Sequence, residues 1–181
     1  MTPRRSRHLA QTVVCAWWLL TLQACTHNIH VTPIPTEPSS ATIDQTLHVE
    51  VPLLALQGPD RMPGVSLLEW PAADLRQAIV EYARQRGTFL TEARGSVTMA
   101  VKAWLWVRSR EAYRYTLHLE SDLGPSGRPS IKSYVIEKET VGSRVRWVTK
   151  SDQDPIAEGV QAALDELFSK IEADAAMYRS R

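Results

Sequence analysis

The feature that most limits the possible folds is a strict alternation of apolar and polar residues near the middle of the chain. Over Ser96–Arg108, one face of an extended chain would carry only Val97, Met99, Val101, Ala103, Leu105 and Val107. A period of two residues is typical of a β-strand with one buried face. The same period returns over Glu111–Glu120, after a tight reversal at Ser109-Arg110. These stretches predict two adjacent antiparallel strands.

Two more strands are expected to continue this sheet. Ser130–Thr140 is the first, and Arg144–Thr149 returns after Gly142-Ser143, which has the chemistry of a hairpin turn. Four strands joined in order predict an antiparallel meander. Leu47–Leu56 predicts a further strand before the meander. Because Pro52 within it cannot donate a ladder hydrogen bond, this strand is expected at an edge or at a bulge.

Two amphipathic helices complete the pattern. Pro71–Arg86 has an apolar stripe and a stop at Gly87, and its arginines, Arg76, Arg84 and Arg86, are expected on a solvated face. The second helix, Asp154–Ala173, opens with a cap and a first-turn proline. A helix with one apolar stripe must bury it, and the apolar sheet face is the available partner. We therefore predict an α+β two-layer sandwich, mainly antiparallel, with both helices packed on one sheet face.

The N-terminus has the organisation of an export signal. A basic segment with Arg4, Arg5 and Arg7 precedes the apolar run Leu9–Leu22, which is shorter than the roughly 20 residues of a membrane-spanning helix. Leu22-Gln23-Ala24-Cys25 closes the run and resembles the cleavage signal of bacterial lipoproteins. Cleavage there would make Cys25 the first residue of the mature chain and the site of lipid attachment. The alternative is a soluble periplasmic protein cut by the ordinary signal peptidase.

This interpretation divides the chain into four parts. Residues 1–24 are the signal peptide, residues 25–46 the lipidated cysteine and a proline-rich tether, residues 47–176 a single α+β domain, and residues 177–181 a fraying tail. The tether is predicted from Pro33, Pro35 and Pro38, because proline-rich segments act as semi-rigid spacers. About 20 residues at roughly 3.1 Å each would hold the domain several nanometres from the bilayer.

Charge and cysteine content exclude several classes of protein. The precursor has 21 Lys+Arg against 20 Asp+Glu, and the signal contains three arginines and no acids. The mature chain therefore carries 18 against 20, which argues against nucleic acid or an anionic surface as the main partner. Cys25 would be its only cysteine, so no disulfide can form within the chain and the fold must rest on its hydrophobic core.

The order of elements resembles a group of small envelope lipoproteins. The residues that carry the resemblance are the signal ending at Cys25, the proline-bearing tether, the helix start Asp74-Leu75-Arg76 and the closing Asp154–Ala173 helix. They are similar to lipoproteins of the YajG type and, more loosely, to auxiliary lipoproteins of ABC-type transporters. The resemblance implies an acylated, palmitate-bearing Cys25 and a periplasm-facing domain without known catalysis. Thr26, standing where an aspartate favours the inner membrane, points by analogy to the outer membrane.

The sequence contains no recognisable catalytic constellation. Only His48 and His118 lie in the predicted domain, and there is no Gly-x-Ser-x-Gly elbow, phosphate loop, dinucleotide fingerprint or zinc helix. We therefore expect no enzymatic activity, no cofactor and no metal site. His118 is expected to be a solvent-facing strand residue. An envelope hydrolase would require an acidic pair, or His118 with an acid and a serine, in a pocket.

The predicted binding residues are Trp104, Trp106, Lys102 and Arg108, on the strand face opposite the aliphatic residues. Tryptophan and arginine are enriched at the energetic centres of protein interfaces. If the helices cover the aliphatic face, these side chains face outward. A register slip of one residue would exchange the two faces, and Ser66–Trp70 or the tether could cover the indoles.

Three functions are consistent with this pattern. The first is a lipid-anchored, non-catalytic accessory in envelope assembly or transport that binds an envelope protein or a second copy of itself. The second is a carrier or sensor of an apolar or glycan ligand that uses the tryptophan face. The third is the envelope hydrolase.

Overall fold

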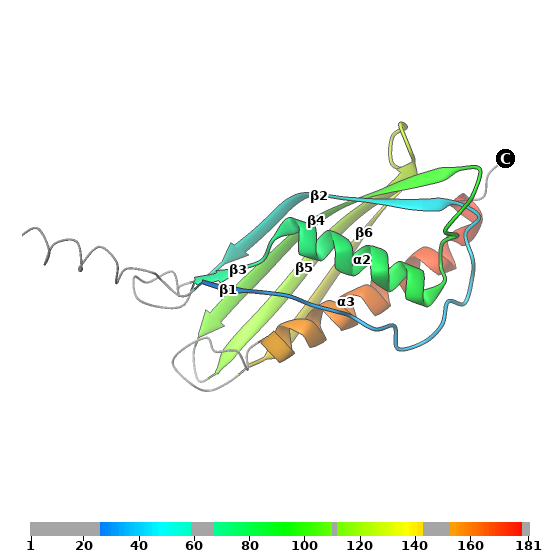
Figure 1. The fold of residues 1–181 in the computed structure, drawn as a ribbon. Helices are drawn as coiled ribbons and strands as arrows, with labels where there is room; N and C mark the ends of the chain where they lie inside the picture. The colour runs from blue at the N-terminus through cyan, green and yellow to red at the C-terminus, as the bar shows by residue number, and fades with distance from the viewer. Residues whose placement is uncertain (1–25, 59–66, 110–111, 143–152, 179–181) are drawn as a thin grey trace, which may run out of the picture.

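The computed structural model describes residues 26–58, 67–109, 112–142 and 153–178. Its elements form two layers, a sheet and a pair of helices that lie on one of its faces (Figure 1). In chain order they are β1 (Thr26–Asn28), β2 (Thr46–Gln57), β3 (Leu67–Glu69), α2 (Ala72–Arg86), β4 (Ser96–Ser109), β5 (Tyr113–Pro125), β6 (Lys132–Val141), α3 (Gln153–Ala173) and the 3-10 turn η2 (Ala175–Tyr178). The predicted strand Arg144–Thr149 falls outside the described residues. The predicted α+β two-layer fold is confirmed.

The main sheet is mixed rather than purely antiparallel. Its strand order is β2-β4-β5-β6, and β4, β5 and β6 form the expected antiparallel meander. β2 pairs with β4 in parallel, with Leu47 opposite Val97 and Leu56 opposite Leu105. The chain reaches β4 from β2 through β3 and α2. Such a crossover returns it to the starting end of the sheet, so the two strands point the same way.

Pro52 lies where the sequence predicted it would. β2 is an edge strand of the four-stranded sheet, and its register with β4 shifts between Glu50 and Leu53. The irregularity places a residue that lacks an N–H donor outside the regular ladder.

The helix boundaries agree with the predictions to within a residue. Gly87 ends α2 in the left-handed conformation, with φ of 78°, and its N–H donates to the Ala83 carbonyl at 3.0 Å. That conformation favours a residue without a Cβ atom. α3 begins at Gln153, so Asp154 lies in the first turn and not before it.

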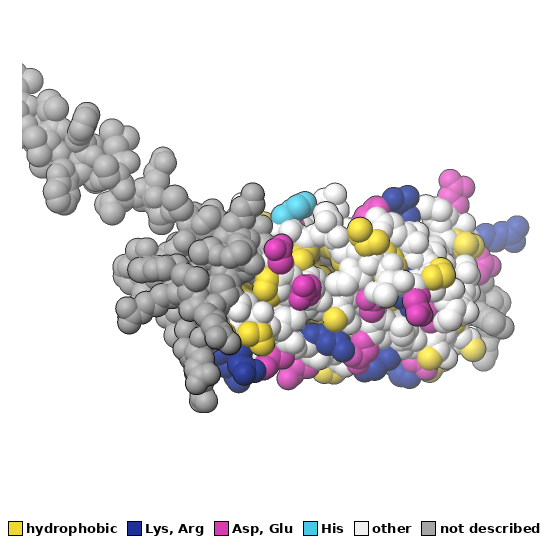
Figure 2. Space-filling view, turned by 90° about the horizontal axis from the view of Figure 1, so that it is seen from below, with side chains coloured by type: hydrophobic (Ala, Val, Ile, Leu, Met, Phe, Trp, Pro, Cys, Tyr) yellow, Lys and Arg dark blue, Asp and Glu magenta, His cyan; other side chains and the backbone are white. Residues whose placement is uncertain are grey.

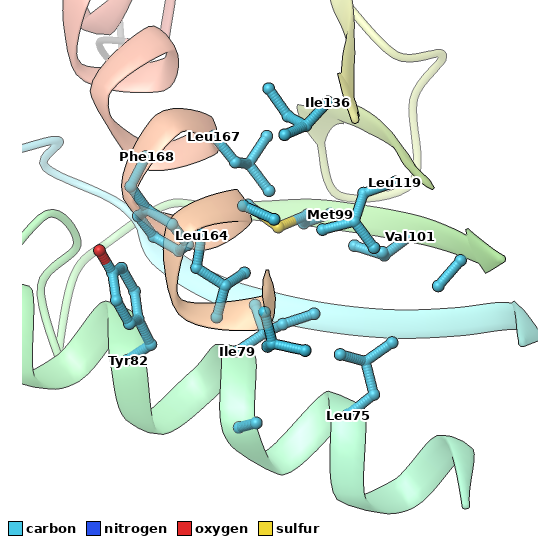
Figure 3. Close-up of a cluster of buried hydrophobic side chains, with 14 of the residues drawn as sticks. Leu75, Ile79, Tyr82, Met99, Val101, Leu119, Ile136, Leu164, Leu167 and Phe168 are labelled. Atoms are coloured by element: carbon cyan, nitrogen blue, oxygen red, sulfur yellow. The ribbon is translucent and has the colours of Figure 1, made fainter. Parts of the chain in front are cut away.

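The core lies between the helices and the sheet (Figure 3). It is built from the predicted faces, and the side chains at its centre include Leu75, Ile79, Met99, Val101, Leu119, Ile136, Leu164, Leu167 and Phe168. Tyr82 packs against Phe168 with ring centroids 5.0 Å apart. Burying each large apolar side chain contributes about 1.5–3 kcal/mol, so this layer supplies most of the driving force for folding.

Residues 29–43, which we call the strap, do not form the spacer that the sequence predicted. They run along the helical layer from β1 towards the far end of the molecule (Figure 1). Ile29 and Ile43 are fully buried, Val31 is 4% exposed, and Ile43 pairs with Phe89 in an isolated bridge. The few apolar residues of the strap are separated by prolines and polar residues, so its sequence resembles that of a linker. The tether prediction is therefore wrong for the strap.

The domain also extends further at its C-terminus than predicted. Tyr178 is 3% exposed, and its hydroxyl lies 2.8 Å from that of Tyr134 on β6. Met177 is 48% exposed, as expected of a tail, but the residue after it is packed. The contact of Tyr178 with β6 requires the turn η2 to pack against the sheet. The predicted fraying is therefore wrong for Tyr178.

Candidate functional site

The sheet face turned away from the helices carries the predicted binding residues. In the register of β4 with its neighbours, Trp104 lies between Ala55 on β2 and His118 on β5. Val101, Ala103 and Leu105 alternate with the tryptophans and are buried in the core. The face assignment made from the sequence is correct, and Trp104 and Trp106 are half-buried on the outer face.

Trp104, Trp106 and His118 form what we call the aromatic cluster. The His118 ring lies 5.4 Å from the Trp104 ring at an interplanar angle of 64°, and 5.7 Å from the Trp106 ring at 51°. The Trp106 Nε1–H donates to Gln57 Oε1 at 2.8 Å. Edge-to-face arrangements at these distances are favourable, and the hydrogen bond fixes one indole. The cluster is therefore a preorganised aromatic surface.

His118 is more enclosed than the sequence suggested. Its side chain is only 18% exposed, with Nε2 3.5 Å from Glu120 Oε1 and Nδ1 3.5 Å from Glu137 Oε2. The Nδ1 atom is buried and has no aligned hydrogen bond, so its contact with Glu137 is electrostatic at most. The expected solvent-facing histidine is on the correct face but lies between two indoles.

Charged side chains surround the aromatic cluster. Lys102 lies 3.8 Å from Glu120, and Arg114 lies 2.6 Å from Glu139, in pairs that are exposed and individually weak. Arg108 is exposed and lies opposite Arg114 in the register. Within the part of the chain that the structure describes, Arg108 has no ion-pair partner.

The outer face has little of what the hydrolase hypothesis requires. His118 has two acids beside it, but Ser121 on the same strand is fully buried on the opposite face. Among residues 26–58, 67–109, 112–142 and 153–178, no group of three or more His, Cys, Asp or Glu side chains is arranged to hold a metal ion. Nor does any helix in those ranges have the length and apolarity needed to cross a membrane.

A pocket of about 850 Å³ opens at the C-terminal end of β2. Its lining comes from Leu54–Gly58 and from Glu69, Trp70 and Pro71. Trp70 is 5% exposed, and its Nε1 has no hydrogen-bond partner among the residues that the structure describes. Gln57 links this pocket to the aromatic cluster, although neither Trp104 nor Trp106 lines it.

A buried polar cluster, which we call the clamp, fastens the strap to α3. Arg86 and Glu172 are at its centre, with side chains 5% and 1% exposed and Nε 2.6 Å from Oε1. Thr88 donates to Glu172 Oε1 at 2.8 Å, and Ser40 donates to Oε2 through its N–H at 3.2 Å and its hydroxyl at 3.0 Å. The predicted solvated face is therefore wrong for Arg86.

The clamp sets the protonation of its own carboxyl group. Burial raises the pKa of Glu172, but the hydrogen bonds from Arg86, Thr88 and Ser40 lower it by more, so its pKa is about 2. Asp165, about two turns earlier on α3, accepts from the hydroxyl of Thr36 at 2.6 Å and from that of Tyr82. Both acids are therefore ionised in the folded protein near neutral pH.

One predicted site residue, Cys25, lies outside the described residues. The residues that the sequence analysis missed are Gln57, Glu120 and Glu137, which contact the aromatic cluster from three different strands. They could have been found only from the pairing register of neighbouring strands, which cannot be deduced from the sequence of one strand alone.

Seen from below in Figure 2, the surface carries acidic and basic side chains interspersed with scattered apolar ones. Scattered apolar residues of this kind are ordinary on a soluble domain.

Comparison with known proteins places the fold. No protein-family model and no curated protein matches the chain. A crystal structure of a Xanthomonas campestris protein of the DUF330 family aligns with a TM-score of 0.58 and 17% identity, over 84% of this chain and 98% of that one. The two chains share a fold. At this identity the likeness extends to nothing beyond the fold.

A second crystal structure, of a minor lipoprotein from Acinetobacter baumannii, aligns with a TM-score of 0.37 and 11% identity, over 68% of this chain and 92% of that one. That score is too low to support a common fold.

Proposed function

We propose that the mature protein is a lipid-anchored, non-catalytic component of the bacterial envelope that binds a protein partner through its outer sheet face. The observation that carries the proposal is the aromatic cluster on a face that neither helix covers. The lipoprotein signal at Cys25 supplies the anchor, and the resemblance to envelope lipoproteins of the YajG type supports the same setting.

The dimensions of the outer face suit such a role. Four strands about 4.8 Å apart and 10 to 14 residues long present roughly 700 Å². Stable protein interfaces bury about 800 Å² on each partner. The middle of the face carries the two indoles, and the margin carries Lys102, Arg108 and several acids. An aromatic centre with a charged margin is the usual anatomy of an interface.

The finer location is the periplasmic side of the outer membrane. Thr26 follows the cysteine, and the absence of an aspartate at that position supports release from the inner membrane by analogy with other lipoproteins. Two or more acyl chains would make the attachment stable, since each buried methylene contributes about 0.8 kcal/mol. The acyl groups would include palmitate.

The anchor is tested by mass spectrometry of the protein expressed with its signal. We expect an N-terminal peptide that begins at Cys25 and carries acyl groups, and recovery of the protein with outer membranes. Cys25→Ser should yield unprocessed precursor or soluble periplasmic protein. An unacylated N-terminus in protein released by osmotic shock would contradict the proposal.

The binding face is tested by crosslinking in intact cells followed by affinity purification. Trp104→Ala/Trp106→Ala should abolish recovery of a specific envelope complex while leaving acylation unchanged. The matched control is Val80→Ala/Leu90→Ala, which removes two apolar side chains, 44% and 39% exposed, outside the outer sheet face. Equal recovery with both double variants would exclude the aromatic cluster as the binding surface. Recovery of only free monomer from the wild type would argue against any stable partner.

A further inference from the structure

The chain enters the folded domain directly after Cys25. Thr26 begins β1, which pairs in parallel with β3 from Thr26 opposite Leu67 to Asn28 opposite Glu69. The N–H of Ile29 then donates to the Glu69 carbonyl at 2.6 Å, and Ile29 is fully buried. If Cys25 carries lipid, no free residue separates the lipid-bearing position from a residue held in a sheet.

The strap is also fixed to the domain, so it cannot serve as a spacer between Cys25 and the fold. Its backbone is fastened to α3 at successive points, with the Ile34 N–H 2.7 Å from Gln161 Oε1 and the Ser40 N–H 3.2 Å from Glu172 Oε2. Ile43 is buried at its far end. A spacer could be drawn out of the strap only by exposing these apolar residues and breaking the clamp.

The attachment point defines one end of the molecule, which we call the anchor end. This end contains β1 and β3, the last residues of β2 and β4, and the first turns of α2 and α3 (Figure 1). The turn between β5 and β6 lies at the opposite end (Figure 1). Since β4 is 14 residues long, the two ends are separated by about 45 Å.

The anchor end carries charges of both signs, with Arg108 against the exposed acids Glu69 and Asp154, and this suits a zwitterionic layer of lipid headgroups. Arg108 is exposed at the end of β4, and the residues that the structure describes provide it with no counter-ion. Both helices point the positive ends of their dipoles in this direction. The pocket beside Trp70 also opens here, with Leu54 and Leu56 in its wall. Arginine favours the headgroup region of a bilayer, and the exposed Arg108 side chain can reach it.

We infer that the anchor end rests directly on the bilayer, so that the occupant of this surface is the layer of lipid headgroups around the anchor. The inference rests on the proposed lipidation of Cys25 and goes beyond it, because lipidation alone would permit a domain on a long tether. The direct seat holds the strands upright and keeps the turn between β5 and β6 away from the membrane.

The experiment uses the acylated full-length protein in vesicles of phosphatidylethanolamine and phosphatidylglycerol. Glu69→Cys places a single free thiol at the anchor end, and Arg128→Cys places one in the exposed turn at the opposite end. Each is labelled with the same fluorophore, and emission is compared in vesicles with and without brominated lipids. The label at position 69 should lose most of its emission, and the label at position 128 should keep its full intensity.

A third variant separates the seat from the anchor. Insertion of about 20 Gly and Ser residues between Cys25 and Thr26 adds a flexible segment with an end-to-end distance of roughly 25 Å. It should restore the emission of the label at position 69 while the protein stays bound to vesicles.

The outcomes distinguish two failures. The inference is overturned if the acylated protein shows equal quenching at positions 69 and 128. It is also overturned if the insertion leaves the quenching at position 69 unaltered. Either result leaves the proposed anchor in place. Protein without acyl groups on Cys25, measured by mass spectrometry on the same sample, overturns the proposed anchor, and the inference with it.

Discussion

Replacing Glu172 by glutamine tests whether the clamp is a principal source of stability. The Glu172 carboxylate accepts five hydrogen bonds, two from Arg86, one from Thr88 and two from Ser40. An amide in its place presents a donor to groups that are themselves donors. It also removes the nearer counter-charge of the buried Arg86 guanidinium and leaves only Asp165, 3.5 Å from Nη1. Removing one partner of a buried pair costs about 3–5 kcal/mol.

The pKa of Glu172 gives a second estimate of the same effect. It lies at about 2, against an ordinary 4.5. Such a difference corresponds to stabilisation of about 3 kcal/mol, which agrees with the mutational range. Because the pKa is lower in the folded state, this stabilisation is complete above pH 4.5. It is lost as the pH falls towards 2.

The measurement is urea unfolding of the unlipidated chain from Thr26 onward, at pH 7 and in steps into the acid range. Glu172→Gln should lower the free energy of unfolding at pH 7 by about 3–5 kcal/mol and should flatten the decline below pH 4.5. The matched control is Glu166→Gln on the same helix. Glu166 forms ion pairs with Lys138 at 2.5 Å and Lys170 at 2.8 Å, but its side chain is 36% exposed. Its loss should be at most about 1 kcal/mol.

Equal effects of the two glutamine variants at pH 7 would refute this reasoning, because burial would then have no bearing on the pair. So would a wild-type protein whose stability is constant through the acid range.

Three further predictions concern the strap, a turn and a buried tyrosine. Ile43→Ala should lower the free energy of unfolding by about 2–5 kcal/mol, because the side chain is fully buried, whereas Ile34→Ala, 69% exposed on the same strap, should change it by less than about 0.5 kcal/mol in the same urea titrations. Two neutral variants would mean that the strap does not pack. Gly124→Ala should cost about 1–3 kcal/mol, since a Cβ atom there would lie 2.7 Å from a backbone atom in the following turn, and an unchanged urea midpoint would refute this. Tyr134→Phe should leave the tyrosinate absorbance change between about pH 9.5 and 11 unaltered, because burial and the hydroxyl of Tyr178 raise the pKa of Tyr134 well above its ordinary value; a smaller absorbance change would show that Tyr134 titrates normally.

The sequence predicted the elements whose pattern is local. The alternation over residues 96–120 fixed which side chains of β4 and β5 enter the core, and Pro52 identified an edge strand with a bulge. Gly87 marked the end of α2 because its conformation is a property of one residue. Each of these features depends on a few neighbouring residues.

The parts that failed depend on contacts between residues far apart in the chain. The parallel pairing of β2 with β4 is set by the path through α2, which a strand-by-strand reading does not contain. The strap was mistaken for a spacer because its partners are on α3, more than 120 residues later. Arg86 was assigned to solvent for the same reason: its partner Glu172 becomes a neighbour only after folding.

The pairing of the strap with α3 also constrains the order in which the protein can assemble. A ribosome makes the strap before Gln161, Asp165 and Glu172, which hold it and which follow more than 120 residues later. The hairpins of β4, β5 and β6 join near neighbours and can close without them, whereas contacts distant in sequence form slowly. The backbone of Ile34, Thr36 and Ser40 thus lacks its hydrogen-bond partners until α3 arrives. A nascent or secreted chain that lacks α3 would leave the strap unfastened and open to chaperones and proteases.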